Sequence, residues 1–260
     1  MMAEHPALPA HRRGLRTFLI VATVILTGAL GLAVGRLLPA RSQTETAWNR
    51  VSTGPGETRE ISLPDGSTIW LNAESEVFYP SEFKGSERKI FAGGEIYADI
   101  AKDPDRIFLM ETGTMNIRVF GTRFNVRTYA DSDISEVFLD EGSISADIEG
   151  YGAEVKMRPG ELVRYSRSAS SLEKYTYDTD KYATWTQDSR LVIVNMRLQD
   201  IVGELERRFG VRISIATEGL KGIRYYASFI NNESLQQILS GLNNDGRLHF
   251  RGDDKNIIIY

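Results

Sequence analysis

Nineteen consecutive residues without a charge, Thr17 to Gly35, stand between Arg16 and Arg36 near the start of this 260-residue chain. As a helix rising about 1.5 Å per residue, the run spans roughly 28 Å, which matches the hydrocarbon thickness of a bilayer. Three arginines and one glutamate precede it, and positive flanks stay in the cytoplasm. The sequence therefore predicts a short cytoplasmic segment (1–16), one membrane-spanning helix (17–38) and a large exported portion.

A cleaved signal peptide is the alternative interpretation of this run. The apolar core of a signal peptide has about 7–15 residues and ends at a small-x-small cleavage site. The run here is longer, and Leu38-Pro39-Ala40 has a bulky residue where a small one is required. The sequence favours a retained anchor.

Composition narrows the function classes for the exported portion. Cysteine is absent, which excludes disulfides, thiolate nucleophiles and cysteine metal sites. The net charge is −4, and acidic residues outnumber basic ones after Arg36, so a nucleic acid is not expected as a partner. About 220 residues follow the anchor, enough for one large domain or two modest ones with their own cores.

Residues 39–50 are polar and lack periodicity, so they are predicted to be a linker, and a β pattern follows over 51–166. Apolar residues alternate on both sides of the turn Pro64-Asp65-Gly66, which is typical of a hairpin. Turns of the same kind recur at residues 91–95, 139–143 and 157–161. Because their intervals are irregular, we expect no fixed repeat but one antiparallel domain, either a sandwich or a solenoid-like stack of hairpins.

The inward-facing side of the chain changes within this β region. Ile117 and Val119 occupy odd positions, whereas Phe124 and Val126 occupy even ones. Side chains alternate between the two faces of a strand, so the change of parity predicts a β-bulge at Gly121-Thr122.

A second polar stretch, residues 167–188, is predicted to be a linker, and residues 189–260 are predicted to form a small α+β domain. Helical spacing extends from Leu198 to Phe209 and ends at Gly210, and a second helix is expected from about Glu233 to Leu242. Strands are predicted at residues 191–194, 211–215, 225–229, 248–250 and 257–260.

The residues that carry chemistry in other proteins have structural explanations here. Glu95, Asp99, Asp103 and Asp105 lack the glycine and the spacing of an EF-hand, so no metal site is expected. Asp140-Glu141 occupies a hairpin turn, where solvated carboxylates are the rule. No glycine-rich loop leads from a strand into a helix. The sequence therefore predicts a protein without catalytic residues or a cofactor.

Several segments, taken together and in order, resemble the FecR family of transmembrane sensors, the anti-sigma regulators of iron and glycan uptake in Gram-negative bacteria. The residues that carry the resemblance are LPDGSTIWLNAESEVFYP (63–80), GGEIYADI (93–100), VFGTRFNV (119–126) and PGE (159–161). The last 70 residues resemble the C-terminal domain of Bacteroidetes members, which is similar to the short domain of secretins and TonB-dependent transducers.

The resemblance implies an inner-membrane protein with a cytoplasmic N-terminus and a periplasmic bulk. Its implied partners are the signalling domain of a TonB-dependent outer-membrane transporter and an extracytoplasmic-function sigma factor. The chain departs from the family in one respect: about 16 residues precede the membrane segment, where the family has a longer helical region that holds the sigma factor. Pro6 and Pro9 would break a helix within those residues.

Two apolar runs near the limits of the C-terminal domain are candidate docking strands, because an incoming strand can pair with an exposed sheet edge. They are Leu191, Val192, Ile193 and Val194, and Ile257, Ile258, Ile259 and Tyr260. The alternative is that both runs are central strands. A second function class, glycan binding, rests on a stacking surface of tyrosines, namely Tyr175, Tyr177, Tyr182, Tyr225 and Tyr226.

Overall fold

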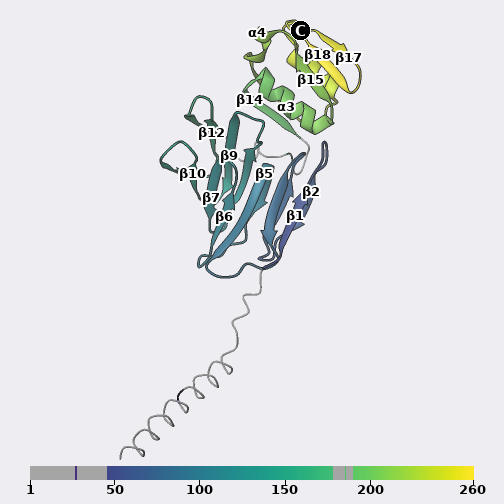
Figure 1. Ribbon diagram of the computed structural model, residues 1–260. Coiled ribbons are helices and arrows are strands. Elements are labelled where there is room, and N and C mark those ends of the chain that lie inside the picture. The colour runs from purple at the N-terminus through teal and green to yellow at the C-terminus, as the bar shows by residue number, and fades with distance from the viewer. Residues whose placement is uncertain (1–26, 28–45, 178–184, 186–189) are drawn as a thin grey trace, which may run out of the picture. The chain divides into compact units, whose positions relative to one another are not determined.

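The computed structural model describes residues 27, 46–177, 185 and 190–260 (Figure 1). Within these residues, no helix is both long and apolar enough to cross a bilayer. The predicted membrane segment, residues 17–38, lies outside the described residues apart from Thr27.

Residues 48–176 form thirteen strands, which pair in two sheets that share the long strand β5 (Figure 1). The strands are β1 (Trp48–Ser52), β2 (Arg59–Ser62), β3 (Thr68–Leu71), β4 (Glu76–Pro80), β5 (Glu87–Asp99), β6 (Ile107–Glu111), β7 (Met115–Val119), β8 (Arg123–Thr128), β9 (Ile134–Glu141), β10 (Ile144–Ile148), β11 (Glu154–Met157), β12 (Glu161–Ser166) and β13 (Ser171–Thr176). Sheet 1 contains β1, β4, β6, β7, β10, β11 and the first half of β5; sheet 2 contains β2, β3, β8, β9, β12, β13 and the second half of β5.

The strand β5 passes from sheet 1 to sheet 2 at Gly93-Gly94. Its first half pairs with β4 and β6, and from Gly94 onward it pairs with β8. Gly94 has a φ of 93°, and a Cβ there would lie 2.7 Å from the Cα of Ser75. The close approach and the positive φ both require glycine, so Gly94 fixes the place where one strand serves both sheets.

The two sheets enclose a single apolar core, which confirms a mainly-β domain and corresponds to the sandwich alternative. Ile90, Met110 and Ile117 contribute from sheet 1, and Leu71, Phe124 and Val137 from sheet 2.

A buried ion pair fastens the hairpin turn before β3 to this core. Arg88 is fully buried and lies 2.8 Å from Asp65, and it also donates to the carbonyls of Ala101 and Arg106. The turn aspartate therefore has a structural partner.

The predicted bulge at Gly121-Thr122 is wrong. β7 belongs to sheet 1 and β8 to sheet 2, so residues 120–122 carry the chain from one sheet to the other. The inward-facing parity changes because the sheet changes, not because a strand is bulged. Gly121 has a φ of 149°, and a Cβ there would lie 2.7 Å from the Cα of Lys102.

Residues 190–260 form the α+β part that the sequence predicts, with a core of its own. The elements are β14 (Leu191–Arg197), α3 (Leu198–Phe209), β15 (Arg212–Ile215), α4 (Glu218–Lys221), β16 (Arg224–Phe229), α5 (Leu235–Leu242), β17 (Phe250–Gly252) and β18 (Asn256–Ile259). They build a two-stranded sheet, β14–β16, and a three-stranded sheet in the order β15–β18–β17. The core contains Ile193, Leu198, Ile201, Leu205, Ile238 and Ile259.

Two strands occupy stretches that were expected to be linkers. β1 begins at Trp48, and β13 covers Ser171–Thr176. β13 pairs only with β12 among the described strands, and most of its side chains are exposed. Only Leu172 and Tyr175 of this strand are partly buried, so its sequence has too little apolar alternation to distinguish it from a polar loop.

Candidate functional site

Opposite charges alternate across five neighbouring strands of sheet 2. The register places Glu95 of β5 opposite Arg127 of β8, Arg127 opposite Glu136 of β9, Glu136 opposite Arg164 of β12, and Arg164 opposite Glu173 of β13. Directly opposed side chains of opposite charge stabilise a sheet. We call these five residues the charge ladder.

Most of the ladder is buried. Glu95, Arg127, Glu136 and Arg164 are each less than a tenth exposed. The Nε of Arg164 lies 2.6 Å from Glu136, whereas the Nη1 of Arg127 lies 3.9 Å from the same carboxylate. Buried charges are tolerated only when they are paired and hydrogen-bonded, so the ladder requires a cover that also supplies polar groups.

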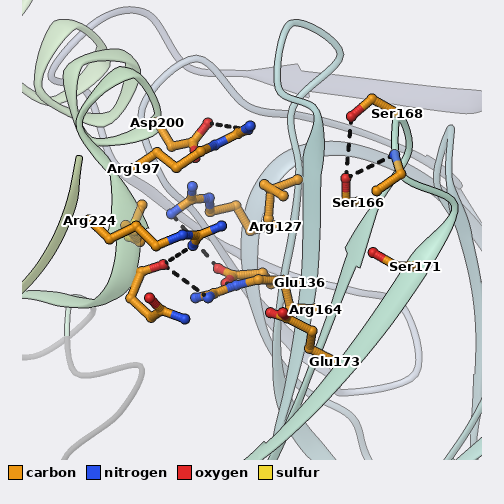
Figure 2. Close-up of a pocket in the computed structure, with 14 residues that line it drawn as sticks. Arg127, Glu136, Arg164, Ser166, Ser168, Ser171, Glu173, Arg197, Asp200 and Arg224 are labelled. Atoms are coloured by element: carbon orange, nitrogen blue, oxygen red, sulfur yellow. Dashed lines mark hydrogen bonds and ion pairs between the residues drawn. The ribbon is translucent and has the colours of Figure 1, made fainter. Parts of the chain in front are cut away.

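The cover comes from the C-terminal domain, beginning with a bulge in β14. The pairing of β14 with β16 shifts register between Ile193 and Met196, and Asn195 has a φ of 50°. The guanidinium of Arg164 donates to the carbonyl of Val194 at 3.0 Å and to that of Asn195 at 3.5 Å. Arg224, the first residue of β16, donates to the same Asn195 carbonyl at 2.5 Å (Figure 2).

The helix α3 supplies the second half of the cover. Arg207 lies 3.1 Å from Asp131, and its guanidinium stacks 3.9 Å from the ring centre of Tyr129. The carbonyl of Arg207 accepts a hydrogen bond from the amide of Gly56, at 2.8 Å, in the β1–β2 loop. Glu204 lies 3.8 Å from Arg127 of the ladder. We call the ladder and these contacts from β14 and α3 the ionic joint.

At one end of the ladder, Glu95 is held by amides. It accepts from the side-chain amides of Asn72 at 2.7 Å and Asn125 at 3.0 Å, and Asn125 accepts from the indole of Trp185 at 3.0 Å. Burial, and after it the neighbouring Glu204 carboxylate, raise the pKa of Glu95 to about 7.

A cavity of about 200 Å³ opens beside the joint (Figure 2). It lies between the β12–β13 hairpin, the β14 bulge and the start of α3, and Figure 2 shows the ladder arginines and Glu136 pointing toward the C-terminal residues. One arginine of the cavity, Arg197, is paired with two carboxylates: it lies 2.8 Å from Asp200 and 3.7 Å from Asp133. The arrangement orients two domains by fixed charges.

The acidic residues weighed as a calcium site do not converge on one point. Glu95 belongs to the buried ladder, whereas Asp99 and Asp105 are exposed. Asp103 lies 2.7 Å from Arg106, and Asp140 accepts from the hydroxyl of Tyr97.

The structure separates the two candidate docking strands. β18 lies between β15 and β17, and Tyr260 pairs its main chain with His249. The main chain of Ile257–Tyr260 is therefore occupied, and the expectation that this run is an open edge is wrong. Parallel pairing with β15 decides this.

The other run, Leu191–Val194, pairs with β16 along one edge, and its Val194 carbonyl accepts from Arg164 of the ladder. Partner binding by these residues stays a prediction. Among the described strands of this domain, β16 pairs only with β14 and so has an unused edge, and β15 and β17 likewise pair only with β18.

The predicted tyrosine surface is only partly described, because Tyr182 lies outside the described residues. Tyr175 and Tyr177 lie with ring centres 6.2 Å apart, and Tyr226 is 72% exposed on β16.

Sequence reasoning missed the ladder, although a signal for it exists. Arg127, Glu136 and Arg164 each stand in the middle of a strand whose other residues are mostly buried. A charge inside such a strand predicts a buried pair.

Comparison with known proteins gives two family matches in the order expected for one regulator. The family described as FecR protein matches residues 49–145, and the family described as FecR, C-terminal matches residues 190–259. Together they span more than half of the chain. A search of curated proteins finds no match.

Two solved structures share the fold. They are crystal structures of candidate anti-sigma factors from Parabacteroides distasonis, with TM-scores of 0.78 and 0.77 and sequence identities of 22% and 23%. Each comparison covers 82% of this chain and 99% or 98% of the other. The two domain matches, in this order and on this fold, show that the chain belongs to the FecR family.

Proposed function

We propose that the protein is a single-pass inner-membrane regulator whose periplasmic part relays a signal from a TonB-dependent outer-membrane transducer to an extracytoplasmic-function sigma factor. The observation that carries the proposal is the presence of both FecR regions in one chain, held together by the ionic joint. The nineteen-residue apolar run between Arg16 and Arg36 supports the membrane anchor.

The open edge of β16 is the docking surface that we propose for the transducer. The unpaired edge of a strand offers main-chain donors and acceptors to an incoming strand, and the side chains beside that edge select the partner. Tyr226 on β16 is 72% exposed, and Ile230 just after it is 53% exposed. These two residues would supply the apolar contact.

The joint gives this surface a connection to the β domain. Arg224, at the start of β16, and Arg164, on β12, donate to the same Asn195 carbonyl. A partner that moves β16 also moves Arg224. The hydrogen bond from Arg224 to the Asn195 carbonyl then changes, and Arg164 donates to the same carbonyl. The relay uses contact between proteins and no catalysis.

Site-specific photocrosslinking in the native cell tests the docking surface. A benzoylphenylalanine in place of Tyr226 is expected to capture a TonB-dependent transporter, identified by mass spectrometry. The same probe in place of Tyr151, which is 40% exposed in the β domain, is the matched control and is expected not to capture it. Equal capture at both positions, or capture of cell-wall glycan alone at Tyr226, contradicts the proposal.

Cell fractionation tests the anchor. The chain is expected to remain with the inner membrane after alkaline carbonate extraction, and a variant without residues 17–35 is expected in the soluble fraction. Extraction of the intact chain by carbonate contradicts a membrane-spanning segment.

A further inference from the structure

Two buried carboxyls from different domains line one small cavity at the ionic joint. Glu95 lies on β5 and Glu204 on α3, and both line a small cavity of about 60 Å³. Among the residues that the structure describes, the buried Oε2 of Glu204 has no hydrogen-bond partner. Its ion-pair contact with Arg127, at 3.8 Å, is longer than a hydrogen bond. A buried carboxylate oxygen in this state is costly.

We propose that docking of α3 onto sheet 2 takes up one proton, held by Glu95, so that the ionic joint tightens as the pH falls. The property concerns the docking of the two domains and does not depend on the identity of any signalling partner.

The charged groups around Glu95 and Glu204 do not fully neutralise the two carboxyls, so the site can bind this proton. The charged and titratable groups that face it are Arg127 on β8, Tyr129 after β8, Glu136 on β9, Arg190 before β14, and Arg207 and Arg208 on α3. Arg127 is shared between Glu136 and Glu204, at 3.9 and 3.8 Å, and Arg207 pairs with Asp131 at 3.1 Å.

The contact of Glu204 with Arg127, at 3.8 Å, is longer than a hydrogen bond. Glu95 is bound by two neutral amides. When the joint closes, two carboxyls leave water for one buried site, and binding a proton to one of them relieves both their repulsion and the desolvation of a charge.

The sign and size of the effect follow from the pKa of Glu95, which is about 7 in the closed joint and about 4.3 for a glutamate in water. Below pH 4 the carboxyl is protonated in both states, and above pH 8 it is ionised in both. Between these limits closing binds a proton, so closing weakens as the pH rises. From pH 6 to pH 8 the closing constant is expected to fall about tenfold.

Amide hydrogen exchange of the full chain in detergent, followed by NMR, measures this constant. The amide of Gly56 donates across the joint to the carbonyl of Arg207, so it exchanges when the joint opens. The amide of Thr53 donates to Ser75 within the β domain and is the internal control. After correction for intrinsic exchange, Gly56 protection is expected to fall about tenfold from pH 6 to pH 8, while Thr53 protection stays constant.

Three substitutions identify the groups responsible. Glu95→Gln and Glu204→Gln are each expected to flatten the pH dependence at Gly56, the first because no carboxyl remains at that site, the second because it lowers the pKa of Glu95. Glu218→Gln, at an 85% exposed side chain of α4, is the matched control and keeps the wild-type response. The proposal is overturned if Gly56 protection in the wild type is constant from pH 6 to pH 8. It is equally overturned if both Glu95→Gln and Glu204→Gln retain the tenfold change.

Discussion

Replacing Arg164 by Met is the sharpest test of the ionic joint. Arg164 is buried, lies 2.6 Å from Glu136 and donates to the Val194 carbonyl across the joint. The methionine keeps much of the apolar stem and removes the guanidinium. The substitution therefore leaves Glu136 buried with one longer ion-pair contact, to Arg127 at 3.9 Å, and leaves a carbonyl of β14 without this donor.

The expected loss is about 3 kcal/mol of unfolding free energy. Removing one partner of a buried ion pair costs about 3–5 kcal/mol, and the remaining contact of Glu136 with Arg127 places this case at the lower end. For a chain of this size, a loss of that magnitude lowers the urea midpoint by roughly 1 M. Circular dichroism during urea unfolding of the full chain measures it.

Two companion variants separate charge burial from packing. Arg50→Met removes the ion pair with Glu76, in which the Arg50 side chain is 64% exposed, and is expected to cost less than about 1 kcal/mol. Arg164→Met combined with Glu136→Gln is expected to be more stable than Arg164→Met alone, because the neutral amide no longer buries a charge. If the double variant is no more stable than the single one, or if Arg164→Met costs as little as Arg50→Met, the reasoning is refuted.

Four further substitutions test the β domain and the bulge by the same urea titration. Gly94→Ala is expected to lower the free energy of unfolding by more than about 3 kcal/mol, because its Cβ would lie 2.7 Å from the Cα of Ser75. Gly66→Ala has open space around its Cβ and a φ of 85°, and it is expected to cost about 1 kcal/mol. Equal costs for the two variants would contradict this reasoning. Asn195→Gly is expected to stabilise by up to about 1 kcal/mol because its φ of 50° suits glycine, and a loss of stability would show that the asparagine side chain matters. Arg88→Met leaves Asp65 buried without its 2.8 Å partner and is expected to cost about 3–5 kcal/mol; a cost below 1 kcal/mol would argue against a structural role for the pair.

Local periodicity predicted the C-terminal elements well because their signals are local. The spacing from Leu198 to Phe209 gives α3 with the expected bounds, and Gly210 ends it in the left-handed conformation with a φ of 62°. The predicted helix near Glu233 begins at Leu235, after a capping box formed by Ser234 and Gln237. Each of these signals lies within a few residues of the structure that it specifies.

Local periodicity could not predict which strands pair with each other outside the hairpins. Whether Ile257–Ile259 is an edge or a centre depends on its parallel pairing with β15, about 44 residues earlier in the chain. An apolar run fits either position. Likewise, the parity change near Gly121 was visible, but it does not distinguish a bulge from a crossing between sheets.

Prediction of the candidate site from sequence has the same limit, because the charge ladder depends on strand order. Each of Arg127, Glu136 and Arg164 stands out in its own strand, yet their alternation depends on the order β8–β9–β12 and on a cover that follows about 30 residues later. Sequence alone shows that each predicted strand contains one of these charges, and alternation places Arg127 on the face opposite Phe124 and Val126. Only the register shows that they neutralise one another, and only the tertiary fold shows that α3 and β14 complete them.

The use of charges at the joint has a physical consequence that an apolar interface would lack. Apolar contact is non-directional, so an apolar helix face can change its register on an apolar sheet at little cost in free energy. On the ladder, neighbouring strands lie about 4.8 Å apart and carry opposite charges. A shift of α3 by one strand would move Glu204 from Arg127 to a position over Glu95 or Glu136, so its ion pair would be lost and the repulsion between buried carboxylates would increase. The joint therefore disfavours intermediate registers, and the C-terminal domain is either docked in one register or released. That is the behaviour required of an element that transmits a signal between two domains without chemistry.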